Sequence, residues 1–356
     1  MRRILLIFSI GLCMMLPVTA GACTRVLWSS EGEPVITGRN MDWFEKMDTR
    51  LRIMPRGIQR KGLAGKNSLI WKSKYASVVA TVWDEVSCDG LNEKGLVANM
   101  LYLAETGFGE RDPARGALSV SLWAQYYLDN FATVREAVEA TREDNFQVLP
   151  VYIMHKGDKV KSPVHLSLSD AKGDSAIIEI IGGETVIHHD ESFTVMTNSP
   201  PYEKQLAILK GYRGLGGQKP LPGSSSSIDR FVRAAYYLKK LPEKPENYRQ
   251  AVAGVLSVMR NAATPIGVAD PDKPNISSTL WTSVSDSTDS TYYFEFTRLP
   301  NIVWVRLDEA GVLAGDPESE LDLTADPTLN GDVTARFRKT DPLAFAPAGS
   351  LGGPAE

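Results

Sequence analysis

The sequence has little of what marks several functional classes. Lysine plus arginine (39) do not exceed aspartate plus glutamate (43), which leaves a net charge of −4 and no basic stripe. Nucleic acid is therefore not an expected partner. No His-x-x-x-His, Cys-x-x-Cys or Gly-x-Ser-x-Gly pattern occurs, so the sequence predicts no metal site, no cofactor and no serine nucleophile elbow. Its 43% hydrophobic and 23% charged residues are typical of a globular protein.

Long apolar runs are also absent, except at the start of the chain. Two arginines there precede an apolar run, residues 4–15, that is too short to span a bilayer comfortably. The small residues Ala20 and Ala22 then form an A-x-A cleavage pattern. We interpret residues 1–22 as a signal peptide that is removed after Ala22. The exported chain then begins at Cys23 and has no membrane span.

Cysteine is scarce, and its three positions differ in meaning. Cys13 leaves with the signal peptide, so Cys23 and Cys88 remain. In an oxidising compartment such a pair most often forms a disulfide. Alternatively, Cys23 is a free reactive thiol. A third interpretation is an exported binding protein that is anchored by lipid on Cys23, although Ala20 occupies the place where a lipid-modification site usually has leucine.

An N-terminal cysteine offers chemistry that no other position has. Its thiolate is the nucleophile, and its own α-amino group, with a reference pKa of about 7.7–8.0, is partly neutral near pH 7. That amine can take the thiol proton and later return it to a leaving amine. Arg39 and Asp42 lie close behind in the chain, where a cation would favour the thiolate and a carboxylate would orient the amine. This spacing alone is also typical of a surface ion pair.

The predicted elements occur in blocks and not in a βαβ alternation. Thr133 and Glu136 form a capping box that begins a helix, and residues 342–356 indicate a loose tail. This order favours antiparallel sheets covered by helix pairs, an α+β fold. We predict strands at 35–38, 51–54, 77–83, 95–101, 165–169, 175–181, 185–188, 281–284, 291–296 and 302–306, helices at 118–127, from 134, at 228–238 and around 252–259, and turns at Asp89-Gly90 and Glu93-Lys94-Gly95.

Several short motifs follow one another from Cys23 to about Arg306, over most of the exported chain. They are Cys23-Thr24-Arg25, Thr37 to Asp42, Asp89 to Leu96, Met196 to Pro200, Leu221-Pro222-Gly223, Ser226 to Arg233, Trp281 to Val284 and Tyr292 to Phe294. In this order they resemble the motifs of the choloylglycine hydrolases and penicillin V acylases, a family of N-terminal nucleophile hydrolases. Each motif is short, but the shared order is highly specific.

The resemblance implies an αββα sandwich in which two antiparallel sheets lie face to face between helix pairs. One domain over residues 23–341 would form it. The resemblance also implies that Cys23 attacks an amide carbonyl and forms a thioester, which water then hydrolyses. Arg39 and Asp42 would assist Cys23 in this reaction.

Further site residues follow from the same resemblance. The side-chain N–H of Asn198 and the backbone N–H of Tyr102 would stabilise the oxyanion, and Arg230 would support the thiol. The family needs no cofactor, and the resemblance suggests a homotetramer.

The substrate pocket is predicted around Tyr102. Leu101-Tyr102-Leu103 stands where many bile salt hydrolases have Leu-Asn-Phe, and the aromatic residue resembles the penicillin V acylases. Trp43 and Trp83 fit an apolar pocket wall and core packing equally well. A chain with a signal peptide resembles the Gram-negative, periplasmic branch of the family. That branch implies phenoxyacetyl amides or N-acyl homoserine lactones as substrates, and bile salts less so.

Overall fold

The computed structural model describes residues 23–143, 146–155, 158–267 and 277–352. The predicted signal peptide lies outside these residues, so its cleavage stays a prediction. Within the described chain, no helix combines the length and the apolar character that crossing a bilayer requires.

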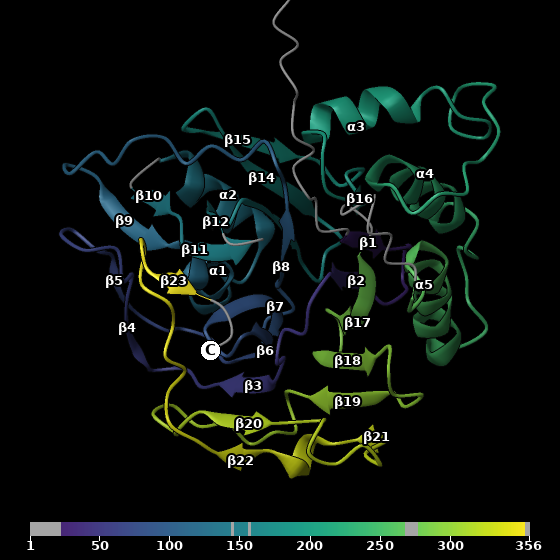
Figure 1. Ribbon diagram of the computed structural model, residues 1–356. Helices are drawn as coiled ribbons and strands as arrows, with labels where there is room; N and C mark the ends of the chain where they lie inside the picture. Colours follow the sequence, from purple (N-terminus) through teal and green to yellow (C-terminus); the bar gives the residue numbers. More distant parts are fainter. Residues whose placement is uncertain (1–22, 144–145, 156–157, 268–276, 353–356) are drawn as a thin grey trace, which may run out of the picture.

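Two large β-sheets form the centre of the molecule (Figure 1). Both are antiparallel, except that the last two strands of the smaller sheet pair in parallel. The smaller sheet has the order β16 (Val195–Met196), β1 (Thr24–Trp28), β2 (Ile36–Trp43), β17 (Ser278–Asp286), β18 (Thr291–Phe296), β19 (Val303–Arg306) and β21 (Gly331–Asp332). The larger sheet has the order β15 (Glu184–His189), β14 (Ser175–Ile181), β13 (Val164–Ser169), β8 (Val97–Tyr102), β7 (Val86–Asn92), β6 (Ser77–Val82), β3 (Leu51–Met54), β20 (Ser319–Leu321) and β22 (Arg338–Lys339).

Helices cover the outer face of each sheet. On the smaller sheet, α4 (Ser227–Leu238) packs against β1, and α5 (Tyr248–Ala262) packs against β1, β2 and β17. On the larger sheet, α1 (Trp123–Asn130) packs against β7 and β8, and α2 (Val134–Arg142) packs against β14. These layers confirm the predicted αββα sandwich. The helix α3 (Tyr202–Leu209) packs against α4 and was not predicted.

Shorter elements surround the sandwich. A single turn of 3₁₀ helix, η1 (Val120–Leu122), precedes α1, and a second, η2 (Thr334–Arg336), follows β21. These elements are β4 (Gln59–Lys61) with β5 (Ile70–Lys72), β9 (Gly116–Ser119) with β10 (Phe146–Leu149), β12 (Asp158–Lys161) with β11 (Tyr152–His155) and β23 (Leu351–Gly352), η1 (Val120–Leu122) and η2 (Thr334–Arg336).

The predicted capping box begins α2. Thr133 Oγ1 accepts a hydrogen bond from the backbone N–H of Glu136 (3.2 Å), and the Glu136 carboxylate accepts one from the backbone N–H of Ala132 (2.9 Å). These bonds satisfy N–H groups that have no partner inside the helix. The sequence therefore predicted the beginning of this helix correctly.

The predicted turn at Asp89-Gly90 is wrong, because both residues lie inside β7 and are buried. A Cβ at Gly90 would lie 2.7 Å from the backbone oxygen of Val78, so only glycine fits this part of the sheet. The Asp89 carboxylate accepts hydrogen bonds from Asn99 (2.7 Å) and Ser283 (3.0 Å). Asp89 therefore links the two sheets with buried polar contacts.

The prediction of a loose tail is also wrong as far as the described residues reach. Leu343 and Phe345 are buried, and the Ala346 carbonyl accepts hydrogen bonds from Ser119 and Ser121 (2.7 Å each). Farther on, β23 pairs in parallel with β11. The segment is rich in proline, glycine and alanine, but its backbone is held by partners that are distant in the sequence.

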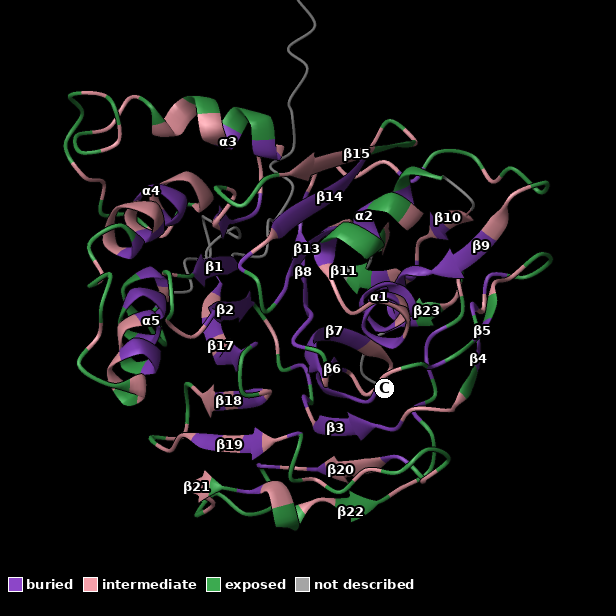
Figure 2. Cartoon of the chain, turned by 180° about the vertical axis from the view of Figure 1, so that it is seen from behind, coloured by how far each residue is buried: buried purple, intermediate pink, exposed green. Residues whose placement is uncertain are grey.

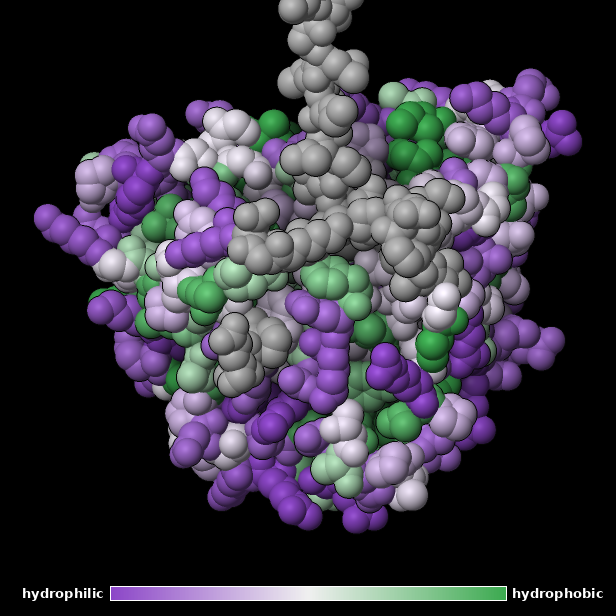
Figure 3. Space-filling view, viewed as in Figure 1, coloured by the Kyte–Doolittle hydropathy of each residue, from purple (hydrophilic) through white to green (hydrophobic). Residues whose placement is uncertain are grey.

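The burial pattern follows the layers (Figure 2). Strands at the centre are buried, and the connecting loops are mostly exposed. On the face drawn in Figure 3, hydrophobic side chains lie in small separate groups among hydrophilic ones. The large apolar surface is therefore between the layers, which is where the candidate site residues described next also lie.

Candidate active site

Cys23 directly precedes β1, and its side chain is only 2% exposed. Its Sγ lies 3.9 Å from each of three groups on β2: Met41 Sδ, the backbone oxygen of Asp42 and Nη2 of Arg39. The antiparallel pairing of β1 and β2 brings these residues to the thiol. The prediction that Arg39 and Asp42 approach Cys23 therefore agrees with the structure.

Arg39 points into the space between the two sheets. Its Nη2 donates to the backbone oxygen of Met100 (3.0 Å), and its guanidinium lies 4.4 Å from the ring centre of Trp281. Its Nη1 lies 4.0 Å from the carboxylate of Asp89. Arg39 is thus a buried cation that reaches Cys23 from the side of the larger sheet.

Asp42 lies on the opposite face of β2, because side chains alternate along a strand. Its Oδ1 accepts a hydrogen bond from Thr279 Oγ1 (2.5 Å), and its Oδ2 lies 3.9 Å from Nη1 of Arg230. No hydrogen bond reaches Oδ2 from the residues that the structure describes. Burial raises the pKa of Asp42 to about 7, and Arg230 opposes this shift. Arg39 and Asp42 therefore do not form an ion pair with each other.

Asn198 follows β16 and joins Cys23 to the end of β8. Its Oδ1 accepts hydrogen bonds from the backbone nitrogen of Cys23 (2.6 Å) and from Nη2 of Arg230 (2.9 Å). Its Nδ2 donates to the backbone oxygen of Tyr102 (2.8 Å). Gln205 holds this loop by donating to the backbone oxygen of Asn198 (2.5 Å). Because an amide nitrogen carries two hydrogens, one Nδ2 N–H beside Cys23 is left for another acceptor.

Arg230 extends from the first turn of α4 to the start of β1. Its Nη1 donates to the backbone oxygen of Cys23 (2.5 Å) and to Oγ1 of Thr24 (2.6 Å), while its Nε donates to the backbone oxygen of Ser225 (2.9 Å). The guanidinium is buried, and burial lowers its pKa, an effect that the Asp42 carboxylate opposes. Arg230 thus orients the backbone of Cys23 from the side opposite to Arg39.

Opposing effects act on the thiol. Burial raises the pKa of Cys23, the positive charge of Arg39 lowers it, and the negative charge of Asp42 raises it again. The balance in the full chain lies above the ordinary value of a thiol. A proton acceptor beside the sulfur is therefore needed if this thiol is to act as a nucleophile near neutral pH.

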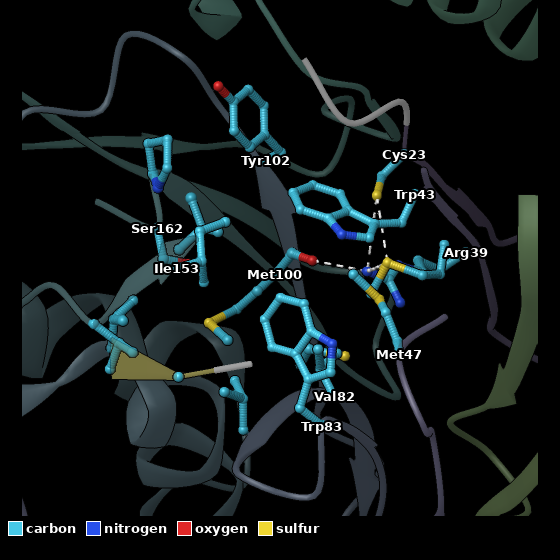
Figure 4. Close-up of a pocket in the computed structure, with 18 residues that line it drawn as sticks. Cys23, Arg39, Trp43, Met47, Val82, Trp83, Met100, Tyr102, Ile153 and Ser162 are labelled. Atoms are coloured by element: carbon cyan, nitrogen blue, oxygen red, sulfur yellow. Dashed lines mark hydrogen bonds between the residues drawn. The ribbon is translucent and has the colours of Figure 1, made fainter. Parts of the chain in front are cut away.

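An apolar pocket opens at Cys23 (Figure 4). Its empty space, including open solvent at its mouth, is about 740 Å³. Tyr102 lines it, as the sequence predicted, and so do Trp43 and Trp83, for which the sequence left a pocket wall and core packing open. The Trp43 and Tyr102 rings lie 6.2 Å apart. The other lining residues are Cys23, Arg39, Met41, Met47, Val82, Val86, Cys88, Met100, Val120, Val151, Ile153, Ser162, Pro163, Val164 and Gly352.

Cys88 lines the same pocket but is not bonded to Cys23. Both cysteines are free, so the disulfide interpretation does not hold in this structure. Cys88 Sγ donates to the backbone oxygen of Ala80 (3.5 Å), and burial raises its pKa to about 12. Among the described residues, no group of three or more histidine, cysteine, aspartate or glutamate side chains is placed to hold a metal ion.

Two further residues support the site and were missed in the sequence. Thr279 holds the Asp42 carboxylate, and Asp89 lies behind Arg39 and binds Ser283 and the Tyr292 hydroxyl. A signal existed in β17, where polar residues occupy positions that a strand with an apolar core face would fill with hydrophobic ones. The partners of those polar residues are far away in the sequence, so their roles were not readable from it.

Comparison with known proteins identifies the family. A model of the family described as linear amide C-N hydrolases, choloylglycine hydrolase family, matches residues 23–322. The chain is 40% identical to a penicillin V acylase of Pectobacterium atrosepticum, over 91% of this chain and 92% of that protein. It is 25% identical to a bile salt hydrolase/transferase of Bifidobacterium longum subsp. longum, over 76% of this chain and 90% of that protein.

Solved structures show the same relationship. The penicillin V acylase from Agrobacterium tumefaciens superimposes with a TM-score of 0.83 at 42% identity, covering 91% of this chain and 99% of that chain. A conjugated bile acid hydrolase from Clostridium perfringens has a TM-score of 0.71 at 20% identity, covering 84% and 96%, and shares the fold. The family match and these relatives cover nearly the whole described chain, so the protein belongs to the choloylglycine hydrolase family of linear amide C–N hydrolases.

Proposed function

We propose that this protein is an exported hydrolase of the penicillin V acylase type, with Cys23 as its N-terminal nucleophile. The observation that carries the proposal is the place of the Cys23 thiol, on the wall of an apolar pocket and 3.9 Å from the Arg39 guanidinium. The A-x-A pattern before Cys23 supports removal of residues 1–22, and the family match begins at the same residue. A signal peptide in this branch of the family favours the periplasm as the location.

Removal of residues 1–22 would give Cys23 the base that its thiol needs. The backbone nitrogen of Cys23 would become an α-amino group, which is partly neutral near pH 7. It takes the thiol proton, and the Arg39 charge favours the resulting thiolate. The ammonium form could also donate a hydrogen bond to Oδ2 of Asp42, which accepts none from the described residues.

The proposed reaction then proceeds in two stages. The Cys23 thiolate forms a bond to the amide carbonyl carbon, and the carbonyl electron pair moves to oxygen. The second Nδ2 N–H of Asn198 and the backbone N–H of Tyr102 stabilise this oxyanion. As the electron pair returns, the C–N bond breaks, and the Cys23 ammonium gives its proton to the leaving amine. A thioester and a free amine result.

Water completes the cycle. The α-amino group of Cys23 takes a proton from water, and the hydroxyl oxygen bonds to the thioester carbon. Collapse of the second tetrahedral intermediate breaks the C–S bond, and the proton on the amine returns to sulfur. The products are a carboxylic acid and the thiol enzyme. Arg230 keeps the Cys23 backbone and Asn198 in place throughout.

The lining of the pocket favours an apolar acyl group. Trp43, Trp83 and Tyr102 offer aromatic faces to a phenoxyacetyl group, and aromatic pairs contribute about 0.5–1.5 kcal/mol beyond their area burial. The many aliphatic and methionine side chains also suit the linear chain of an N-acyl homoserine lactone. Bile salts are the third candidate, through the bile salt hydrolase relatives.

A hydrolysis panel tests the proposal. Penicillin V, long-chain N-acyl homoserine lactones, glycocholate and taurocholate are offered to the purified exported protein, and the released amine is measured. We expect hydrolysis of penicillin V or of the acyl homoserine lactones above that of the bile salts. Replacement of Cys23 by Ala should abolish it while circular dichroism stays unchanged. Cys23→Ser should lower it strongly with normal processing, because serine is the weaker nucleophile.

Two outcomes would contradict the assignment of the nucleophile. Retained hydrolysis in Cys23→Ala would refute it directly. Complete loss of hydrolysis in Cys88→Ala, with Cys23→Ala still active, would show that Cys88 and not Cys23 is the nucleophile.

The alternative class, a binding protein anchored by lipid on Cys23, is distinguished from the enzyme by its mass. A diacylglyceryl group on the Cys23 sulfur, followed by N-acylation, would block the thiol and the amine that the proposed reaction uses. N-terminal sequencing and intact mass should give an unmodified chain that begins at Cys23. A diacylglyceryl mass would refute the enzyme. The tetramer suggested by the family resemblance is checked by light scattering on the same sample.

A further inference from the structure

The last described residues of the chain lie across the pocket from the thiol. We call residues 343–352 the C-terminal strap. Its end, β23, borders the pocket on the side away from Cys23 (Figure 4, where β23 is the yellow strand). Gly352 is a lining residue. The strap lies beyond residues 23–322, the part that the family model matches.

Backbone hydrogen bonds attach the strap to the pocket wall. The backbone N–H of Tyr152 donates to Ser350 (2.9 Å), the backbone N–H of Gly349 donates to Pro150 (2.9 Å), and Gly352 is the strand partner of Ile153. Ile153 itself lines the pocket. The strap therefore fixes one edge of β11, the strand that supplies part of the wall.

The strap also connects two other wall segments. The backbone N–H of Ala346 donates to the backbone oxygen of Glu85 (3.1 Å), next to the lining residue Val86. The backbone oxygen of Ala346 accepts from Ser121, next to the lining residue Val120. One residue of the strap thus joins the loop before β7 to the 3₁₀ turn η1.

The fit at the end of the strap is close. A Cβ at Gly352 would lie 3.0 Å from Cγ1 of Val151 and 3.1 Å from Oε2 of Glu85. Both distances are shorter than ordinary van der Waals contact, so the strand is packed tightly against the wall. Such a wall does not give way readily to a longer ligand.

We propose that the C-terminal strap is the far wall of the acyl pocket and sets the length of acyl group that the enzyme accepts. The ligand class is a linear or aryl-terminated acyl chain whose carbonyl lies at Cys23 and whose far end reaches Ile153 and Gly352. This proposal rests on the proposed function, since it takes the pocket to be the acyl site.

Removing the end of the strap tests this. The variant that lacks residues 351–356 loses β23. The variant Ile153→Ala keeps the strap but removes side-chain atoms from the pocket wall at the same place, which leaves space for a longer acyl chain. The substrates are 4-nitroanilides with linear acyl chains of graded length, so that the amine is constant. Each variant is judged by the ratio of kcat/KM for a chain too long for the full-length enzyme to kcat/KM for its best chain. This ratio is insensitive to the fraction of protein that is folded.

Both variants should shift the preference to longer chains. A newly accommodated methylene should raise the ratio by about fourfold, from its burial in apolar surroundings. Leu351→Ala is the matched control, because Leu351 is 53% exposed and is not a lining residue. Its ratio should equal that of the full-length enzyme. Ratios within twofold of the full-length value in both wall variants would overturn the proposal.

A binding measurement separates this proposal from the proposed function. Linear carboxylic acids of the same lengths, which are the acid products, are titrated into the full-length protein and the 351–356 deletion by calorimetry. If the deletion variant binds longer carboxylic acids than the full-length protein does, the proposal that the strap is the far wall is supported, even if no anilide is hydrolysed. If the longest acid that binds is the same for the two proteins, the proposal is overturned, even if hydrolysis is confirmed.

Discussion

At the scale of single residues, Asn198 joins three parts of the site through one side-chain amide. Its oxygen accepts from Cys23 and Arg230, and its nitrogen donates to the carbonyl of Tyr102. The same amide therefore positions the proposed nucleophile and supplies a donor beside it. Loss of the side chain removes both functions at once.

We expect Asn198→Ala to lower kcat by about 10²–10³-fold, the usual effect of removing one oxyanion donor, with a smaller change in KM. Steady-state kinetics on the best substrate of the panel measure this. Ser199→Ala is the neighbouring control, because the Ser199 hydroxyl binds Glu105 and the backbone of Ala104 but not Cys23. A kcat for Asn198→Ala within tenfold of that control would contradict the role.

Asp42 carries the clearest pH dependence in the full chain. Burial raises its pKa to about 7, against about 3.9 for an unfolded aspartate. The folded state therefore binds the proton more tightly than the unfolded state. The stability from this group is present below pH 4 and is lost as pH rises through 7.

A chain with a non-cleavable leader before Cys23 shows this effect without the new α-amino group. Between pH 5 and pH 8 its free energy of unfolding in urea should fall by more than about 1 kcal/mol relative to the same chain with Asp42→Asn. The cleaved protein should show a smaller fall, because the ammonium of Cys23 stabilises the carboxylate. Parallel pH curves for the leader-bearing chain and its Asp42→Asn variant would argue against the raised pKa.

The sequence predicted which proposed site residues lie near Cys23 better than it predicted the residues that support them. Cys23, Arg39, Asp42, Asn198 and Arg230 were identified in advance, and the structure brings them together within hydrogen-bond or ion-pair contact of their neighbours. Their motifs are local, so a short stretch of sequence contains the signal. Thr279 and Asp89 were missed because each acts through a partner on another strand, and pairing of distant strands leaves no local pattern.

At the scale of elements, hydrophobic periodicity and capping located several helices and strands, but not all of their boundaries. The helix predicted at 118–127 is observed as the end of β9, the 3₁₀ turn η1 and the helix α1, which begins only at Trp123. The predicted helix 228–238 is observed as Ser227–Leu238, and the strands predicted at 175–181 and 185–188 are observed as the antiparallel pair β14 and β15. The turn predicted at Asp89-Gly90 was wrong, because two residues typical of turns lie in a buried strand whose neighbours leave no space for a side chain. Tertiary packing therefore places these two residues in a strand, although their local propensity favours a turn.

The capping box of α2 makes an element-scale prediction. Thr133→Ala should lower the free energy of unfolding by about 1 kcal/mol, because the backbone N–H of Glu136 loses its acceptor. Hydrolysis should be unaffected, since α2 covers β14 and supplies no residue to the pocket. Urea unfolding of Thr133→Ala beside Thr133→Ser measures the effect. Equal stability of the two variants would show that the cap contributes nothing.

At the scale of the whole molecule, the block order of strands and helices predicted antiparallel sheets covered by helix pairs, and the family resemblance implied the αββα layers. The helix layers could be read because the members of each pair, α1 with α2 and α4 with α5, are close in sequence, whereas both sheets join strands from distant parts of the chain. The end of the chain could not be read in the same way. Its composition resembles a loose tail, yet its partners, β11 and η1, precede it by about two hundred residues. Long-range contacts of this kind turn a composition typical of disorder into part of the pocket.

The central claim is that the chain acts through Cys23 as its first residue. The most direct measurement is the intact mass of the purified protein after hydrolysis of phenoxyacetyl 4-nitroanilide is stopped with acid. Peptide mapping of the same sample then identifies the residue that carries the acyl group. A good leaving group makes acylation fast, so the thioester accumulates. The account predicts a chain that begins at Cys23 and carries one phenoxyacetyl group on Cys23, absent in Cys23→Ala. An acyl group on any other residue, or an active chain that begins elsewhere, would contradict it.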